Sequence, residues 1–113
     1  MDIQTTFRKQ LDGELHRIVD SVELDANCVQ TVYYDEDQNR SEYVEDKLNL
    51  MGEFVDYYTE ELFEFDPWRK EFSAEDIEHI REFVAFAHKA VRSDLNWPEF
   101  KTVAAKLRHH LMN

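Results

Sequence analysis

Apolar side chains recur at steps of three and four residues over most of the chain, which is the spacing of one face of an α-helix. Four segments show this pattern: residues 5–24, 41–63, 74–92 and 97–111. Glycine and proline number only two each, whereas an all-β domain needs many such residues in its turns. The pattern therefore predicts a mostly α, four-helix domain.

The first two predicted helices each carry a narrow apolar stripe. In residues 5–24 the stripe consists of Phe7, Leu11, Leu15, Ile18 and Val22. In residues 41–63 it consists of Val44, Leu48, Met51, Val55, Tyr58 and Leu62. Asp66-Pro67 is expected to end the second helix, because the residue before a proline avoids the helical region.

The last two predicted helices begin at recognisable capping residues. Ser73 precedes residues 74–92, and Asn96 precedes residues 97–111 with Pro98 in the tolerant first turn. The apolar arc of residues 74–92 is wide, so this helix is expected to contact several neighbours near the centre of the domain.

Residues 25–40 interrupt the helical pattern. The run from Val29 to Tyr34 is mostly β-branched and aromatic, which favours an extended backbone, and the polar residues 35–40 are typical of a loop. No partner strand is evident from the pattern. We therefore expect one short extended segment or hairpin arm after the first helix, within a single domain that spans residues 1–113.

The charge is strongly acidic and unevenly distributed. The chain has 25 acidic and 13 basic residues, a formal net charge of −12, and residues 35–82 alone contain 17 acidic against 5 basic residues. Such a chain repels nucleic acid and anionic membranes, so we expect no direct binding to either. A basic partner protein suits this charge, because opposite charges accelerate encounter.

Carboxylates concentrate on one side of the second predicted helix. Opposite its apolar stripe lie Glu42, Asp46, Glu53, Asp56, Glu60 and Glu64, together with Tyr57. Carboxylates at helical spacing repel one another, and no Lys or Arg intervenes among the last four. This surface either keeps the protein soluble or binds a basic partner.

The concentration of charge and the nearby aromatic residues favour binding, since aromatic residues often dominate binding energy. The candidate partner-binding residues are Asp35, Glu36, Asp37, Glu53, Asp56, Tyr57, Glu60, Glu64, Asp66 and Trp68. A row of carboxylates can imitate the charge of a nucleic-acid backbone. Nuclease immunity proteins, antitoxins and phage inhibitors of defence systems such as anti-CRISPR proteins work in similar ways, so we expect an inhibitor of a nucleic-acid-binding partner.

The sequence contains little indication of a catalytic or metal site. Cys28 is the single cysteine, and no glycine-rich phosphate loop or zinc-protease motif occurs. Asp12, His16 and Asp20 share a helix face, and Asp76-x-x-His79 departs from a di-iron motif, which needs Glu and a second copy. We therefore expect no enzyme activity, no cofactor and no metal ion.

Two alternatives remain open. An acidic helical secretion chaperone or adaptor would hold a hydrophobic client segment, and it would leave Leu50, Phe54 and Phe86 exposed in the free monomer. Burial of the same residues in a homodimer is compatible with either function. The absence of a signal-peptide pattern and of a long apolar stretch predicts a cytoplasmic protein.

Overall fold

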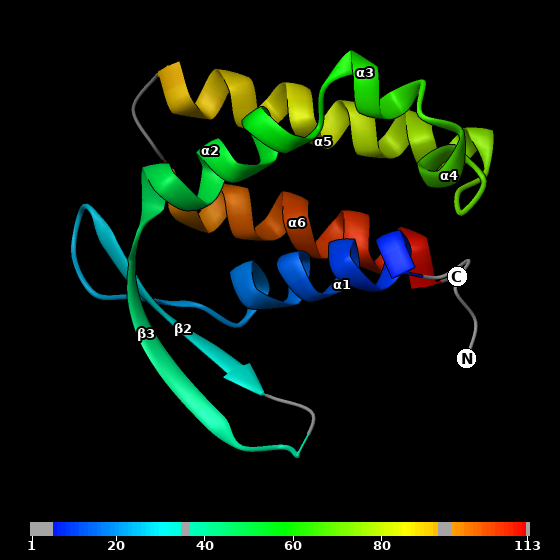
Figure 1. The fold of residues 1–113 in the computed structure, drawn as a ribbon. Helices are drawn as coiled ribbons and strands as arrows, with labels where there is room; N and C mark the ends of the chain where they lie inside the picture. The colour runs from blue at the N-terminus through cyan, green and yellow to red at the C-terminus, as the bar shows by residue number, and fades with distance from the viewer. Residues whose placement is uncertain (1–5, 35–36, 93–95, 113) are drawn as a thin grey trace.

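The computed structural model describes residues 6–34, 37–92 and 96–112, and these residues form helices together with a three-stranded antiparallel sheet (Figure 1). The elements are α1 (Thr6–Val19), β1 (Val22–Glu23), β2 (Cys28–Tyr34), β3 (Arg40–Asp46), α2 (Lys47–Tyr57), α3 (Glu60–Phe63), α4 (Asp66–Arg69), α5 (Ala74–Arg92) and α6 (Trp97–Met112). The prediction of a mostly α, four-helix domain is therefore wrong, and the fold is α+β.

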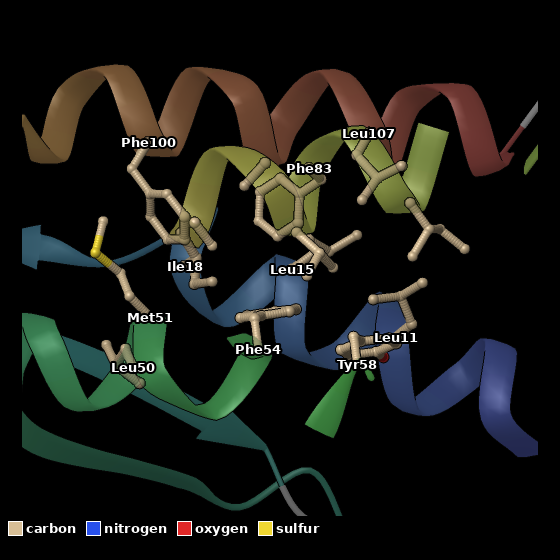
Figure 2. Packing of buried hydrophobic residues seen from close by; sticks show 14 of the residues in the cluster. Leu11, Leu15, Ile18, Leu50, Met51, Phe54, Tyr58, Phe83, Phe100 and Leu107 are labelled. Atoms are coloured by element: carbon tan, nitrogen blue, oxygen red, sulfur yellow. The ribbon is translucent and has the colours of Figure 1, made fainter. Parts of the chain in front are cut away.

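The four longer helices surround one hydrophobic core (Figure 2). Leu15 of α1, Phe54 of α2, Phe83 of α5 and Phe100 of α6 are all buried there. The predicted helix over residues 74–92 is confirmed, and the one predicted over 97–111 extends by one residue. Their apolar arcs specified both helices, because most residues of each arc are buried in the core or packed against it.

The main correction concerns residues 41–46, which form most of β3 and not the start of a helix. β3 pairs with β2 in an antiparallel register that places Thr31 opposite Tyr43 and Val29 opposite Glu45. The extended run of β2 needs a hydrogen-bonding partner, and β3 supplies it through a hairpin. Gln38, in the hairpin turn, has a φ of 65°, the left-handed conformation that such turns use.

The apolar residues predicted to form one stripe over residues 41–63 therefore do not share one buried face. Val44 lies on the outer face of the sheet with 67% of its surface exposed, and Leu48 is also exposed. Helix α2 begins at Lys47, because the Asp46 side chain caps it by accepting hydrogen bonds from the next helical N–H groups. Its buried residues are Lys47, Leu50, Met51 and Phe54.

The predicted row of helical carboxylates is broken at two places. Glu42 belongs to β3 and Asp46 caps α2, so neither shares a helix face with Glu53. At the other end α2 stops at Tyr57, and Thr59 caps the separate short helix α3. No single helix in the described residues carries the six acidic residues in one row.

Helix α1 ends earlier than the sequence predicted, at Val19. The buried Ser21 hydroxyl donates to the Ile18 carbonyl at 2.6 Å and accepts from Trp97 Nε1 at 3.1 Å. Lys101 Nζ also donates to the Ser21 carbonyl oxygen at 2.7 Å. These contacts fix the turn between α1 and β1 against the start of α6, so Val22 enters the sheet instead of extending the helix.

Candidate functional site

Helices α1 and α2 together form a shallow acidic depression of about 390 Å³. Its lining consists of Gln10, Glu14, Glu53, Asp56 and Tyr57. The three residues of α2 point outward, because Phe54 and Tyr58 of the same segment are buried in the core. Three carboxyl groups and one phenol thus converge from two helices.

Glu14 is the most perturbed carboxyl group at this depression. Burial raises the pKa of Glu14 from its ordinary value of 4.5 to about 7. The hydrogen bond that Tyr58 Oη donates to Glu14 at 3.4 Å opposes this shift, and the charge of Glu53 adds to it. The protonation of Glu14 therefore changes close to neutral pH.

Arg17 joins this depression to the sheet. Its guanidinium group donates to Glu45 Oε1 at 2.8 Å and lies 3.5 Å from Glu53 Oε2. The same group lies over the ring of Tyr33, 4.8 Å from the ring centroid. One cation thus contacts a carboxylate of β3, a carboxylate of α2 and an aromatic ring of β2.

The hairpin of β2 and β3 forms a second open depression of about 500 Å³, lined by Tyr33, Tyr34, Ser41, Tyr43 and Glu45. The rings of Tyr33 and Tyr43 pack edge to face, with their centroids 5.1 Å apart. Burial raises the pKa of Tyr33 to about 12, so its phenol stays neutral. The hydroxyl of Thr31 donates to Glu45 and holds that carboxylate in place.

We call these two depressions and the arginine between them the tyrosine–carboxylate surface. It consists of Glu14, Arg17, Tyr33, Tyr34, Tyr43, Glu45, Glu53, Asp56 and Tyr57. Carboxylates bind ammonium and guanidinium groups, and tyrosine rings cover the apolar stems of such side chains. The chemistry of this surface suits a basic protein surface.

Only part of the sequence-predicted site lies on this surface. Glu53, Asp56 and Tyr57 belong to it. Glu60 pairs instead with Arg81 at 2.6 Å, and this hydrogen bond lowers the pKa of Glu60. The exposed Glu64 follows α3.

The remaining predicted residues are dispersed. Asp66 is exposed in the first turn of α4, and Asp37 is exposed near the hairpin turn. Asp35 and Glu36 lie outside the described residues. Trp68 is 0% exposed and packs against the rings of Tyr58, Phe63 and Phe72, so it is a core residue that does not reach the surface.

Sequence reasoning missed Glu14, Arg17, Tyr33, Tyr43 and Glu45. The sequence did carry a signal for the last two, because Ser41-Glu42-Tyr43-Val44 contains aromatic and β-branched residues that favour a strand. Glu14 and Arg17 had no such signal, since charged residues on the outer face of a first helix are common. Only the packing of α1 against α2 and β2 distinguishes them.

The metal-binding candidate from the sequence consists of Asp12, His16 and Asp20. In the structure His16 pairs with Asp20, and Asp12 pairs with a residue of α6. Asp12 accepts a hydrogen bond from Arg108 at 2.9 Å, and His16 Nε2 lies 2.8 Å from Asp20. Helices α5 and α6 instead bring together Glu75, His79 and His110. The sequence pattern gave no sign that His110 would lie beside His79.

Comparisons with protein-family models, with curated proteins and with solved structures gave no match. None of the helices in the described part of the chain has the length and apolar composition that crossing a membrane requires.

Proposed function

We propose that this chain is a non-enzymatic, cytoplasmic binding protein that uses its tyrosine–carboxylate surface to cover a basic surface of a nucleic-acid-binding partner and so inhibits that partner. The observation that carries the proposal is the convergence of Glu14, Glu53 and Asp56 in one depression beside Tyr57. A lysine or arginine of a partner entering this depression would find carboxylates that Arg17 only partly neutralises.

The aromatic half of the surface supports a protein partner more than a free small cation. Tyr43 is more than half exposed, beside the Glu45 carboxylate that Arg17 and Thr31 already position. Exposed tyrosines that border fixed charges are frequent among residues with large contributions to binding energy. The net charge of −12 would accelerate the encounter with a basic protein.

The chaperone alternative has less support. It requires Leu50, Phe54 and Phe86 to be available for a client, but Leu50 and Phe54 are each only 2% exposed. Phe86 is partly buried against the core, and its ring stacks with that of Phe100, with the centroids 6.3 Å apart. The burial of these side chains therefore disfavours a chaperone that uses them to hold a client.

The test is capture of partners from cells, with the protein as bait and washes at low and at high salt. The bait is compared with a Glu53→Lys/Asp56→Lys variant and with a Glu78→Lys/Glu99→Lys variant. Glu78 and Glu99 are exposed on α5 and α6, and this control changes the net charge by the same amount. The comparison thus separates the local surface from the overall charge.

We expect a basic, nucleic-acid-binding partner that elutes at high salt and that added nucleic acid displaces from the bait. The Glu53→Lys/Asp56→Lys variant should bind about tenfold more weakly or worse, and the control variant should bind nearly as well as the wild type. If both variants lose the partner equally, only the overall charge matters. If neither loses it, the tyrosine–carboxylate surface is not the binding site.

A further inference from the structure

Two helices place three metal-ligating side chains at one end of the molecule. Glu75 and His79 are one turn apart on α5, and His110 lies in the last turns of α6. Figure 1 shows the beginning of α5 and the end of α6 at the same end of the molecule. One ligand atom from each of these residues lies within 4.8 Å of the others.

The geometry directs both imidazoles toward the same carboxylate. Glu75 Oε1 lies 3.9 Å from His79 Nε2 and 4.0 Å from His110 Nε2, and the two rings are tilted by 39° with their centroids 3.8 Å apart. Ligand atoms around a tetrahedral zinc ion lie about 3.3–3.5 Å from one another. All three side chains retain exposed surface, so small rotations would close the remaining gap.

Two neighbouring carboxylates lie close to the two histidines. Glu82 Oε2 lies 4.0 Å from His79 Nδ1, the ring nitrogen that faces away from Glu75. In metal sites this second nitrogen commonly donates to a carboxylate, which fixes the ring and makes it a better ligand. Asp76 Oδ1 lies 3.5 Å from His110 Nε2, so it adds a second carboxylate near the ligand atoms.

We propose that Glu75, His79 and His110 form a binding site for one divalent transition-metal ion, with zinc as the best match. Two imidazole nitrogens and one carboxylate oxygen are a ligand set typical of zinc, whereas magnesium and calcium prefer oxygen alone. Three ligands leave a fourth position for Asp76, water or an external ligand. The ion would link the start of α5 to the end of α6 and stabilise the packing of these helices.

The test uses the untagged full chain, freed of metal and titrated with Zn²⁺ by calorimetry and with Co²⁺ by visible absorption. His79→Ala and His110→Ala remove one ligand each, and His88→Ala on α5 and His16→Ala on α1 are matched controls. Circular dichroism of each metal-free variant establishes that it folds. Thermal unfolding with and without Zn²⁺ supplies a second measurement.

We expect the wild type to bind one ion, to give the absorption of four-coordinate Co²⁺ and to unfold at a higher temperature with Zn²⁺. Each ligand variant should bind at least about tenfold more weakly and lose most of the thermal shift, and Glu82→Gln should weaken binding by about tenfold without changing the stoichiometry. The controls should behave as the wild type does. The proposal is overturned if the wild type binds no ion, or if folded ligand variants bind as well as the controls.

Discussion

At the scale of single residues, Lys47 shows how the sheet and α2 are joined. Its side chain is only 3% exposed, and Nζ donates to Glu23 Oε2 at 2.6 Å and to the Asp25 carbonyl oxygen at 2.7 Å. The backbone N–H of Lys47 also donates to Asn27 at 2.8 Å. A buried ammonium group is tolerated only when its hydrogen bonds are made, and the β1–β2 turn makes them here.

Replacing this lysine with methionine should therefore destabilise the fold. Lys47→Met keeps most of the buried volume but leaves the carboxylate and carbonyl acceptors without their donor, so we expect a loss of about 2–3 kcal/mol in the free energy of unfolding. Chemical denaturation measures this loss, and Lys70→Met, an exposed lysine after α4, is the control. Equal stability of the two variants would contradict the structural role of Lys47.

Glu14 makes a prediction about pH at the same scale. Its pKa is about 7 in the folded protein and near its ordinary value of 4.5 in the unfolded chain. The folded protein thus binds this proton more tightly than the unfolded chain does. The stabilisation that results is complete below pH 4.5 and is lost as the pH rises through 7. Glu14→Gln should remove this loss and exceed the wild type in stability by about 1–2 kcal/mol at pH 8, after allowance for partial exposure.

The measurement is the free energy of unfolding of both proteins between pH 4 and pH 8 in urea. The advantage of Glu14→Gln should shrink as the pH falls, because the wild-type carboxyl is then protonated in both the folded and the unfolded state. An advantage that stays constant over this range would show that Glu14 does not titrate as described.

At the scale of elements, the junction between β3 and α2 distinguishes the observed fold from the predicted long helix. Asp46 Oδ1 accepts hydrogen bonds from the backbone N–H groups of Leu48 at 2.8 Å and Asn49 at 3.2 Å. These donors have no partner inside the helix, so the cap satisfies them. In a continuous helix over residues 41–63, the same aspartate would lie in the interior, where alanine is more favourable.

Asp46→Ala should therefore destabilise the protein by about 1 kcal/mol, the usual cost of losing a helix cap. Asp56→Ala, on the exposed side of the same helix, removes the same charge without removing a cap and should be neutral or slightly stabilising. Urea denaturation of both variants measures the difference. A stabilising Asp46→Ala would favour the continuous helix over the strand.

The sheet is covered on one face only. Val29 and Thr31 of β2 are fully buried under the helices, whereas Val22 and Val44 are exposed on the opposite face. An antiparallel sheet tolerates one solvated face, and the polar residues in β3 are consistent with that arrangement. The hairpin thus also places Tyr33, Tyr43 and Glu45 at the tyrosine–carboxylate surface.

At the scale of the whole molecule, the net charge of −12 opposes folding through repulsion among carboxylates. Ion pairs such as Arg8–Asp76 at 2.7 Å and Arg17–Glu45 relieve only part of it. Salt screens the long-range repulsion between exposed charges more than it weakens partly buried pairs. The balance of these two effects decides how salt acts on stability.

We therefore expect the midpoint of thermal unfolding near neutral pH to rise as sodium chloride increases from about 20 mM to about 500 mM. Differential scanning calorimetry at constant pH measures it, with potassium chloride as a control for ion-specific effects. A midpoint that falls with either salt would mean that the ion pairs outweigh the general repulsion.

The same charge also opposes association of two copies through their acidic surfaces. The homodimer that the sequence left open was expected to bury Leu50, Phe54 and Phe86, but Leu50 and Phe54 are already buried within one chain. Nothing in the fold of one chain selects this arrangement, so the proposed function assumes a monomer.

Several features followed from the sequence alone. The wide apolar arc of residues 74–92 and the stripe of residues 97–111 determined α5 and α6, because their caps and their apolar periodicity agree. The β-branched run of residues 29–34 determined an extended β2, and the acidic composition determined the charge of the surface. These are local properties, set by residues close together in the chain.

The tertiary structure decided what depends on contacts between distant segments. Residues 41–46 are locally compatible with either a helix or a strand. Pairing with β2 selects the strand, because the backbone groups of β2 need hydrogen-bonding partners. Trp68 could have been exposed, but the aromatic residues around it bury it. Glu14 meets Glu53 and His79 meets His110 only because α1, α2, α5 and α6 pack together, and periodicity along the chain contains no information about which helices become neighbours.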